Sequence, residues 1–421
     1  MAGEFFDDRE TRAPEAREAA RFDALPKQIA HAKETTRAFA KILGDADPEQ
    51  VNSREALAEL PVTRKSDLVD LQAENPPFGG LSSFDAGRVA RIFASPGPIY
   101  EFQTERPDFW RLARALHAAG FRKGDVAHNS FAYHLTPGGW MMDSGARAIG
   151  IGVIPAGVGN SEQQVQAIQH LKPSGFIGTP DFLKVLLDKA EEIGADCSSI
   201  DKALVSGGAL FPSLREEYTG RGVRTLQCYA TADAGLIAYE TADEDGNPNP
   251  GMIVDEELIV EIVRPGTGEP VPAGEVGEVV VTLFNPDYPL VRFATGDLSA
   301  VLEGESPCGR TNMRIKGWMG RADQTTKVKG MFVHPSQVAS VVKRHDEVAR
   351  ARLVVEREAE NDVMTLVCEV EGGAEGAGEA LAEAVAESLQ SACKMKGRVR
   401  FVTPGELPND GKVIEDARSY E

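Results

Sequence analysis

Residues 293–298 read Phe-Ala-Thr-Gly-Asp-Leu, and residues 320–323 read Gly-Arg-Ala-Asp. Both segments join a charged side chain to a glycine turn, and both follow runs of β-forming residues. A carboxylate behind a tight Thr-Gly turn, here Asp297, suits two neighbouring hydroxyls such as those of a ribose. A guanidinium on a glycine turn, here Arg321, suits an anion beside them. The two segments together predict a site for a sugar and an adjacent anion.

The composition is that of a globular protein with more than one domain. With 421 residues, of which 42% are hydrophobic, two or three domains and a sizeable core are expected. The formal net charge is −20, which disfavours nucleic acid and anionic membrane surfaces as partners. An anionic ligand must therefore be met by local positive charge or by backbone N–H groups.

The cysteines and the first residues bear on the compartment. An odd number of widely spaced cysteines favours free thiols in a reducing compartment. Residues 1–12 are acidic and lack an apolar core, unlike a signal peptide. No apolar run approaches the roughly 20 residues of a membrane span. We therefore expect a cytoplasmic protein without a membrane or nucleic-acid partner. The cysteines are Cys197, Cys228, Cys308, Cys368 and Cys393.

The middle of the chain alternates helix-like and strand-like segments. Helices are expected from Pro107 to Gly120, from a capping-box pattern at Ser161 and Gln164, and from Pro180 to Gly194. Such alternation predicts a mostly parallel sheet covered by helices, with ligands at the carboxyl ends of the strands. The expected buried strands are residues 126–131, 149–154, 176–178 and 203–205.

The second half of the chain changes character. Residues 258–297 are strand-rich, with turns that predict an antiparallel subdomain, and a separate α+β piece follows Asp323. The expected fold class is α/β, with a large N-terminal domain of mostly parallel sheets covered by helices. We place that domain at residues 1–321, its β-rich subdomain at about 255–321, and a small, mobile α+β C-terminal domain at 322–421.

Two further segments carry ligand-binding features. Residues 226–233 read Leu-Gln-Cys-Tyr-Ala-Thr-Ala-Asp, a strand that runs into a loop. Tyr229 at the strand end can stack on a base, and Asp233 can hold a hard cation, although a core tyrosine and a turn aspartate fit the pattern too. Gly207 and Gly208 end another strand and let the backbone approach a flat ligand. An ordinary strand-to-helix turn explains these glycines equally well.

Several segments together resemble the phenylacetate–CoA ligase family of the acyl-adenylate-forming (ANL) superfamily. Residues 128–139, HNSFAYHLTPGG, resemble the segment that lines its aryl-acid pocket, and residues 320–337 resemble its hinge region. The likeness extends from PVTRK at residues 61–65 to Gly411-Lys412. It implies an AMP-forming ligase that activates an aryl or similar carboxylic acid as acyl-adenylate and passes it to coenzyme A. The implied cofactors and partners are ATP, Mg²⁺, coenzyme A and the acid, and a homodimer is left open.

The resemblance also implies roles for single residues. Tyr229 would stack on the adenine, Asp297 would bind the ribose hydroxyls, and Arg321 would lie near the ribose and phosphate. Asp233 would bind Mg²⁺. The substrate pocket would hold Phe131, Tyr133 and His134. The implied nucleotide-binding set is Gly207, Gly208, Ala209, Tyr229, Ala230, Asp297 and Arg321.

Two residues near the C-terminus are implied in the reaction itself. Asp323 would be the hinge about which the small domain turns. Lys412 would be the catalytic lysine of adenylation, because a mobile ammonium can meet the charge that builds as pyrophosphate leaves. A solvated residue near the end of the chain is the alternative interpretation of Lys412.

The chain departs from the family at the phosphate loop. The family has a Ser/Thr/Gly-rich loop that ends in lysine and cradles the pyrophosphate of ATP. Here residues 95–101 read SPGPIYE, so Ser95 and Gly97 are the phosphate-loop candidates. Two prolines remove N–H donors, lysine is missing, and Glu101 adds negative charge. An impaired homologue that binds AMP, acyl-adenylate or acyl-CoA is therefore the alternative function, and transfer to another acyl acceptor is a third.

Two other departures concern metal and substrate. Some relatives carry a Cys/His zinc cluster near Cys308, but the sequence has no second cysteine nearby and Asn312 follows instead of histidine, so no structural zinc is expected. Phe131 stands where the family has tyrosine, which makes the pocket less polar. His134 replaces a glycine, which narrows the pocket. The identity of the acid is therefore left open.

Overall fold

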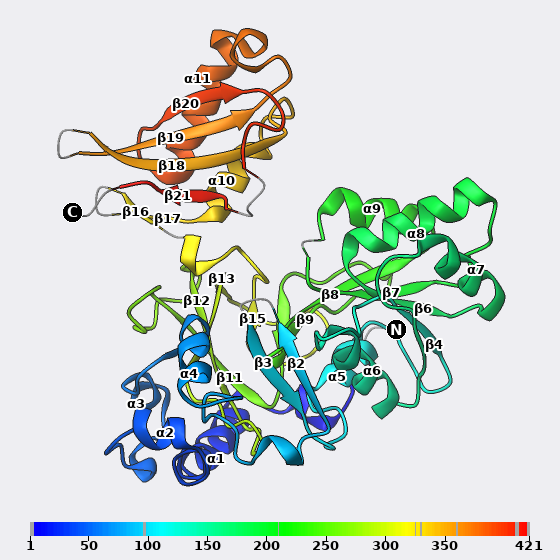
Figure 1. The fold of residues 1–421 in the computed structure, drawn as a ribbon, viewed down its shortest axis with the longest axis vertical. Coiled ribbons are helices and arrows are strands. Elements are labelled where there is room, and N and C mark those ends of the chain that lie inside the picture. The colour runs from blue at the N-terminus through cyan, green and yellow to red at the C-terminus, as the bar shows by residue number, and fades with distance from the viewer. Residues whose placement is uncertain are drawn as a thin grey trace. The chain divides into compact units, whose positions relative to one another are not determined.

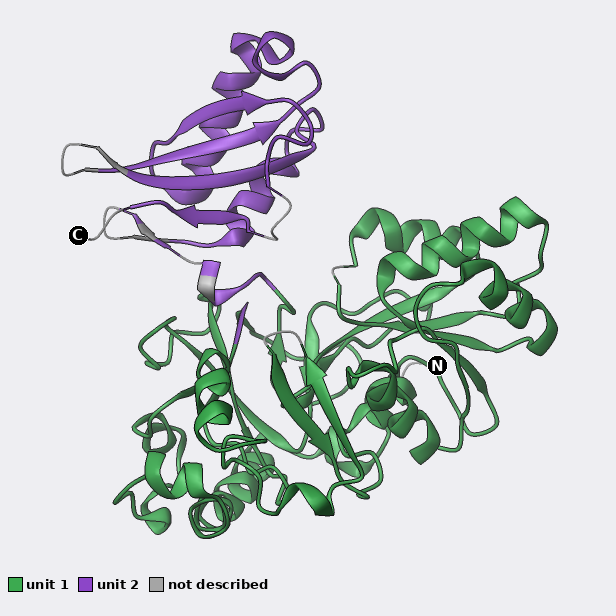
Figure 2. Ribbon diagram, viewed as in Figure 1, with its two compact units in different colours: residues 1–295, 299–318 green, residues 296–298, 319–421 purple. Residues whose placement is uncertain are grey.

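The chain forms two compact units. The computed structural model describes residues 4–95, 98–208, 210–324, 326–328, 331–358, 361–408 and 412–418. The larger unit comprises residues 1–295 and 299–318, and the smaller unit comprises residues 296–298 and 319–421 (Figure 2). The chain thus enters the smaller unit at Gly296, returns to the larger unit at Ser299 and enters the smaller unit again at Met319. The boundary expected from the sequence was residue 321.

A nine-stranded sheet is the framework of the larger unit (Figure 1), in the order β14-β15-β10-β9-β8-β7-β6-β4-β5. Strands β5, β4, β6, β7 and β8 are parallel, and the strands from β9 onward are antiparallel. The parallel strands predicted from the alternating pattern are confirmed, and the antiparallel strands from β9 onward extend the same sheet. The strands are β4 (Val126–Asn129), β5 (Gly152–Pro155), β6 (Gly175–Gly178), β7 (Lys202–Val205), β8 (Arg224–Thr231), β9 (Gly235–Tyr239), β10 (Met252–Val254), β14 (Val301–Leu302) and β15 (Arg314–Ile315).

Helices cover both faces of the parallel strands. Consecutive residues of a strand point to opposite faces. Phe176 of β6 accordingly packs in a core with apolar residues of α7, α8 and α9, whereas Ile177 packs in the main core with residues of α5 and α6. The strand residues are apolar on both faces because neither face meets water. These helices are α5 (Leu112–Ala118), α6 (Gly138–Ala148), α7 (Ser161–Leu171), α8 (Pro180–Ile193) and α9 (Pro212–Gly220).

A second sheet, ordered β1-β13-β12-β11, carries the 293–298 segment. Thr63 of β1 pairs with Phe293 of β13 in parallel, so the PVTRK segment lies beside the start of that segment. Strands β11 and β12 are antiparallel. A separate hairpin, β2–β3, precedes the nine-stranded sheet in sequence. The bounds are β1 (Thr63–Arg64), β2 (Arg91–Ser95), β3 (Ile99–Gln103), β11 (Leu258–Val263), β12 (Gly277–Leu283) and β13 (Phe293–Ser299).

The remaining helices of the larger unit lie mostly in the first 90 residues. They are α1 (Pro14–Thr35), α2 (Arg37–Ile42), α3 (Arg54–Ala58) and α4 (Leu68–Glu74), with 3-10 turns η1 (Asp8–Thr11), η2 (Pro48–Gln50), η3 (Lys65–Asp67) and η4 (Ala86–Arg88). Among the residues that the structure describes, no helix is both long and apolar enough to cross a membrane.

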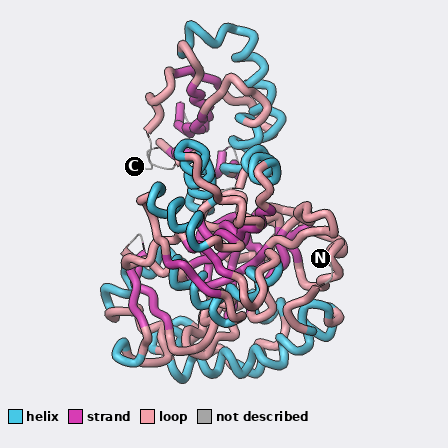
Figure 3. Tube along the Cα trace, turned by 90° about the vertical axis from the view of Figure 1, so that its right-hand side faces the viewer, coloured by secondary structure: helices cyan, strands magenta, loops and turns pink. Residues whose placement is uncertain are grey.

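The smaller unit is an α+β fold with its own core. Its four-stranded sheet runs β20-β19-β18-β21, and apolar residues of α10 and α11 pack on one face of it. Figure 3 distinguishes helices from strands by colour along the chain. The α+β C-terminal domain is the expected class. The elements are η5 (Ala322–Gln324), β16 (Thr326–Val328), β17 (Met331–Val333), α10 (Pro335–Val342), β18 (Arg350–Glu358), β19 (Asn361–Glu369), α11 (Gly373–Cys393), β20 (Arg398–Val402) and β21 (Ile414–Asp416).

Two local expectations were wrong. The helix expected from Pro107 begins only at Leu112, because Asp108 and Arg111 adopt left-handed φ values of 47° and 65°. Arg111 is fixed there by its guanidinium, whose Nε donates to Asp255 Oδ1 at 2.8 Å. A long-range ion pair therefore overrides the local helix signal.

The capping box expected at Ser161 is absent. The helix-capping residue is Asn160, and Gln164 instead donates from Nε2 to the carbonyls of Gly157 and Gly159 at 2.9 and 2.7 Å. The side-chain amide of Gln164 thus fixes the loop between β5 and α7.

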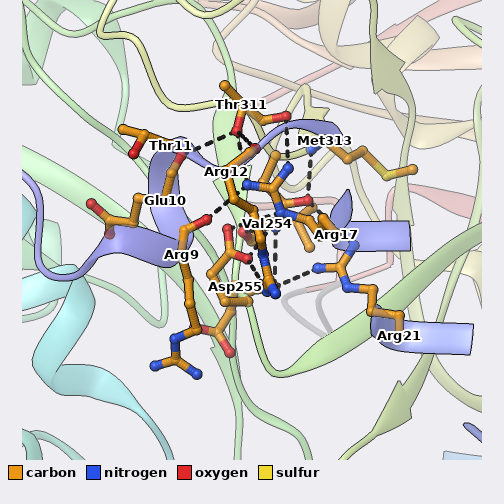
Figure 4. A network of polar contacts seen from close by, with 12 residues as sticks. Arg9, Glu10, Thr11, Arg12, Arg17, Arg21, Val254, Asp255, Thr311 and Met313 are labelled. Atoms are coloured by element: carbon orange, nitrogen blue, oxygen red, sulfur yellow. Dashed lines mark hydrogen bonds and ion pairs between the residues drawn. The ribbon is translucent and has the colours of Figure 1, made fainter. Parts of the chain in front are cut away.

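A buried network of polar contacts fastens α1 to the larger unit (Figure 4). Arg17 Nε lies 2.9 Å from Glu256 Oε2, and both side chains are at most 2% exposed. The Arg17 guanidinium also donates to the carbonyl and hydroxyl oxygens of Thr311 and to the carbonyl of Arg9. Arg21 donates to the carbonyl of Asp255 at 3.3 Å. Three distant segments are therefore joined by charged groups that have no access to bulk water.

Removing one partner of such a buried pair leaves the other charge uncompensated. Arg17→Met should therefore lower the free energy of unfolding of the larger unit by about 3 kcal/mol. Denaturation in urea, followed by tryptophan fluorescence, measures this unit because all three tryptophans, Trp110, Trp140 and Trp318, belong to it. Lys27→Met is the matched control: the Lys27–Asp23 pair is more than 70% exposed and should contribute nothing measurable. Equal midpoints for the two variants would contradict a structural role for the network.

Candidate nucleotide and acyl site

Three predicted residues gather at the carboxyl ends of the parallel strands. Phe131 follows β4, Gly207 follows β7, and Tyr229 lies in the last part of β8. Phe131 lies against Gly207, since a Cβ atom on that glycine would be 3.5 Å from Phe131 Cε1. The residue expected in the acyl pocket and the residue expected beside the adenine are therefore neighbours, at the sheet edge where α/β proteins bind ligands.

The glycine segment after β7 is held against β8. Ser206 Oγ donates to the carbonyl of Cys228 at 2.8 Å, and Gln227 Nε2 donates to the carbonyl of Gly208 at 3.2 Å. Gly207 has a φ of +72°, a conformation that glycine adopts without strain. Ala209, the next predicted residue, lies outside the described residues. The segment thus presents backbone without side chains, as a flat ligand requires.

Tyr229 links β8 to the 293–298 segment. Its hydroxyl lies 3.1 Å from Thr295 Oγ1, and Thr295 Oγ1 itself donates to the carbonyl of Val279. The tyrosine is 7% exposed, and a β-bulge separates it from Ala230. The ring is therefore fixed by a hydrogen bond at its far end, which is the condition for a rigid stacking surface.

Asp297 and Arg321 lie together within the smaller unit. An isolated antiparallel bridge joins the two residues, and the Leu298 amide donates to the Gly320 carbonyl at 2.8 Å. Arg321 Nη1 is 3.4 Å from Asp297 Oδ1. Gly296 has a φ of +77°, where an L side chain is strained, and a Cβ atom there would also lie 2.9 Å from Arg321 Nη2. The two segments whose sequences predicted one site are thus brought side by side.

The pocket candidates differ in how they are placed. The Tyr133 hydroxyl accepts from Asn129 Nδ2 at 2.8 Å and lies 3.4 Å from Asp143 Oδ2, and burial raises the pKa of Tyr133. Its ring packs on Gly139, where a Cβ atom would be only 2.7 Å away. His134, by contrast, is exposed. Tyr133 is therefore held by its own segment, and Phe131 is the aromatic side chain directed toward the glycine loop.

The phosphate-loop position holds a hairpin. Ser95 and Ile99 pair at the end of β2–β3, and Gly97 between them lies outside the described residues. Ser95 Oγ donates a short hydrogen bond to Glu101 Oε1. Glu101 is only 1% exposed, and its Oε2 has no hydrogen-bond partner. The carboxylate that the sequence placed against phosphate is thus turned into the protein, because alternation along β3 puts it on the buried face with Ile99.

Asp233, the predicted magnesium ligand, is paired with a lysine. Lys65 Nζ donates to Asp233 Oδ2 at 2.6 Å, and the Asp233 side chain has no exposed surface. Asp233 Oδ1 has no hydrogen-bond partner and could accept a cation. A single carboxylate together with substrate phosphates is a usual Mg²⁺ arrangement. Within the described residues, no group of three or more His, Cys, Asp and Glu side chains forms a metal site.

These side chains form one cluster of two buried acids and two partly buried residues, which we call the Lys65 cluster: Lys65, Ser95, Glu101 and Asp233. Burial first, and then the charge of Asp233, raise the pKa of Glu101 to about 7, while Ser95 and Lys65 oppose the rise. Burial and the two carboxylates also raise the pKa of Tyr288. At neutral pH the Glu101 carboxyl is therefore close to half protonated, which lessens the negative charge buried beside Lys65.

The segment where relatives carry zinc is held by an ion pair. Arg310 Nε lies 3.0 Å from Glu10 Oε2, and both side chains are at most 5% exposed. Cys308 Sγ lies 3.1 Å from Ser306 Oγ. The absence of structural zinc stays a prediction.

The two C-terminal candidates are connected through the backbone. Asp323 lies in η5, although its side chain is not described, and Lys412 is exposed. The amide of Val413 donates to Gln324 Oε1 at 2.7 Å. The segment after Lys412 is therefore fastened to the turn that contains Asp323. Residues 409–411 lie outside the described residues.

Comparison with known proteins identifies the family. Residues 139–283 match the AMP-binding enzyme family, and residues 330–416 match the AMP-binding enzyme C-terminal domain. The phenylacetate–coenzyme A ligase of Thermus thermophilus is 31% identical over 376 residues, which cover 86% of this chain and 83% of the relative. The chain belongs to the phenylacetate–CoA ligase family. The corresponding ligase of Pseudomonas putida is 30% identical over 351 residues, 80% of this chain and 77% of the relative.

The fold of this family member has a solved counterpart. The open conformation of 2-hydroxyisobutyryl-CoA ligase, in complex with 2-HIB-AMP and CoA, matches with a TM-score of 0.83 at 23% identity and covers 97% of this chain and 93% of that chain. The acyl-adenylate-forming fold predicted from the sequence is confirmed, and so is the class of AMP-forming acid–CoA ligase.

The raised pKa of Glu101 predicts a pH-dependent stability. An ordinary glutamate titrates near 4.5, whereas Glu101 in the folded ligase titrates at about 7. Between these values the folded state keeps a proton that the unfolded chain has lost, so its contribution is present below pH 4.5 and disappears as the pH rises to 7. Glu101→Gln, which mimics the protonated acid, should therefore gain stability relative to wild type with rising pH, by at most roughly 3 kcal/mol at pH 8.

Chemical denaturation of both proteins between pH 4.5 and 8 measures the difference. Ser95, Asp233, Lys65 and Tyr288 face the carboxyl group and remain unchanged in the variant. Glu105→Gln, at an exposed position just beyond β3, is the control and should follow the wild-type profile. Parallel profiles for Glu101→Gln and wild type would show that folding does not raise the pKa of Glu101.

Proposed function

We propose that this ligase converts an aryl or similarly apolar carboxylic acid, ATP and coenzyme A into an acyl-CoA thioester, AMP and pyrophosphate. The observation that carries the proposal is the contact of Phe131 with Gly207, on the same sheet edge as Tyr229. The expected acyl pocket there adjoins the expected adenine site, as an acyl-adenylate requires. Family membership supports the reaction class.

Each half of the nucleotide has candidate partners. Gly207, Gly208, Ala209 and Ala230 would border the adenine, with Tyr229 stacked on it. Asp297 would accept hydrogen bonds from the ribose hydroxyls, and Arg321 would donate to the adjacent phosphate. Support comes from the bridge that holds Asp297 and Arg321 together. Asp233 would hold Mg²⁺ through its unpartnered oxygen.

The proposed reaction has two steps. A carboxylate oxygen of the acid attacks the α-phosphorus of ATP, the bond to the β-phosphate oxygen breaks, and pyrophosphate leaves. The thiolate of coenzyme A then attacks the acyl carbon, and AMP leaves with the bonding electrons. Activation as a mixed anhydride makes the acid a good electrophile. Lys412 would serve the first step, and Asp323 would be the hinge between the two.

The pocket favours an acid without a polar group at its far end. Phe131 offers an aromatic ring and no hydroxyl, and the Tyr133 hydroxyl is already engaged by Asn129 and Asp143. An unpaired polar group buried against such a surface would cost on the order of 1–3 kcal/mol. We therefore expect unsubstituted aryl or alkyl acids to be better substrates than hydroxylated ones.

We place the enzyme in the cytoplasm, where the reducing environment suits five buried free cysteines. Its partners would be the acid, ATP and coenzyme A, and a homodimer remains a hypothesis.

The alternative function is a catalytically impaired homologue that binds AMP, acyl-adenylate or acyl-CoA. The observation in its favour is the phosphate-loop hairpin, where the sequence 95–101 contains two prolines and no lysine. Pyrophosphate release with a panel of aryl and alkyl acids, each with and without coenzyme A, separates the functions. We expect release and thioester formation with at least one apolar acid. No release with any acid would support the binding protein, and release that does not require CoA, with no thioester formed, would support another acyl acceptor.

The proposed role of Lys412 has its own test. Lys412→Ala should lower acyl-adenylate formation by about 10²–10³-fold, because a direct charge contact at the transition state is lost. Thioester formation from a supplied acyl-adenylate should change less than threefold. Lys396→Ala, an exposed lysine of the same unit, is the control and should leave both steps unchanged. An equal loss in both half-reactions would mean that Lys412 does not act in adenylation.

A further inference from the structure

The Lys65 cluster contains more negative charge than an ordinary core position holds. Two carboxylates, Glu101 and Asp233, are buried, and each keeps one oxygen without a hydrogen-bond partner. Burying ionised groups is costly unless they are paired. Lys65 supplies the compensating charge, 2.6 Å from Asp233 Oδ2.

The position of the lysine in the cluster is informative. The side chain of Lys65 is 23% exposed, whereas that of Asp233 is fully buried and Glu101 is 1% exposed. Of these three side chains, only that of Lys65 reaches the surface, and both acids are buried. Among the described members of the cluster, a ligand arriving from solvent would meet the positive group first.

The cluster also lies where the phosphate-loop lysine is missing. Ser95, which begins the 95–98 loop, is bonded to Glu101, and Glu101 senses the charges of both Asp233 and Lys65. Asp233 follows the nucleotide candidate Tyr229 by four residues. Lys65 directly follows strand β1, which pairs in parallel with the start of the 293–298 segment. The ammonium is therefore anchored between the hairpin and the two strands that carry the nucleotide motifs.

We propose that Lys65 takes the place of the missing loop lysine and contacts the phosphate chain of ATP, with Asp233 and Glu101 as positioning residues. The inference rests on the proposed function for the identity of the ligand. It explains why a phosphate loop can lose its own lysine and still face a tetraanionic nucleotide. An ammonium on a long stem can leave a carboxylate for a phosphate without moving the backbone. When no phosphate is bound, the buried carboxylates hold the Lys65 ammonium in one position.

Nucleotide affinity tests the proposal without any turnover. Isothermal titration with ATP and with AMP, each with and without Mg²⁺, compares wild type with Lys65→Met. We expect the variant to bind ATP at least tenfold more weakly and AMP within twofold of wild type, in both metal conditions. Arg64→Met is the matched control: it removes a neighbouring charge that is committed to Glu278 at 2.7 Å, and both affinities should stay within twofold.

Each outcome decides the question. An equal loss of ATP and AMP affinity in Lys65→Met, or no loss of either, would overturn the proposal. If that variant does not fold, Lys65→Arg replaces it: the bulkier, forked head group should change the ratio of ATP to AMP affinity, and an unchanged ratio would overturn the proposal. A failed acid panel with a selective loss of ATP affinity would reject the proposed reaction and keep the lysine assignment. Turnover of an acid by the wild type, with nucleotide affinities unchanged in Lys65→Met, would keep the proposed reaction and reject the lysine assignment.

Discussion

Charge balance at a buried position is the constraint from which the site follows. Glu101 and Asp233 come from strands β3 and the end of β8, and Lys65 comes from the turn after β1. Neither buried carboxylate could be ionised there without a compensating charge except at a cost of several kcal/mol. The contacts among these three residues therefore fix the β2–β3 hairpin, the end of β8 and the turn after β1 relative to one another. A change in any one of the three charges must be answered by a proton or a cation.

The short strand β13 contributes to the placement of two nucleotide candidates. Its Thr295 hydrogen-bonds the hydroxyl of Tyr229, and its Asp297 is itself a candidate, held by Arg321. The chain passes from one compact unit to the other within that strand. Glycine suits position 296 because φ is +77° there and the Arg321 guanidinium lies close to its backbone. Within residues 295–297, Thr295 fixes the ring of Tyr229, Gly296 lets the backbone lie close to Arg321, and Asp297 supplies the carboxylate.

Local sequence patterns predicted the fold well and the site in part. The alternation of residues 126–205 predicted the parallel strands because burial on both faces leaves unbroken apolar runs such as Phe176-Ile177. Helix α8 was predicted at both ends, since Pro180 and Gly194 carry their own conformational preferences. The start of α5 was missed because Arg111 is held by Asp255, 144 residues away in sequence.

Long-range pairing also hid the main feature of the site. Lys65 and Asp233 are 168 residues apart, and nothing near either of them signals the other. Glu101 alternates with exposed Tyr100 along β3, and that period-2 pattern would have placed it with buried Ile99. A charged residue is ordinarily assigned to the solvent face, because an unpaired buried carboxylate is rare. Only the structure shows that this carboxylate accepts a hydrogen bond from Ser95 on the neighbouring strand β2.

The distribution of positive charge explains how so acidic a ligase can take an anionic substrate. The chain has a net charge of −20, so the field of the whole protein repels ATP, and only nearby cations can offset that repulsion. A lysine in the phosphate loop would have supplied one such charge, but residues 95–101 contain no lysine. The prolines at positions 96 and 98 also lack the backbone N–H groups that could bind phosphate. The remaining candidates, Lys65, Arg321 and Lys412, come from three separate segments. Two of them are tied to carboxylates, since Lys65 bonds Asp233 and Arg321 bonds Asp297. Under the proposal for Lys65, nucleotide binding would be an exchange of partners, in which the ammonium leaves or shares Asp233 when phosphate arrives. The affinity of Lys65 for phosphate would then depend on how firmly Asp233 holds the ammonium, and Glu101, whose pKa is raised to about 7, would adjust that balance by taking up a proton.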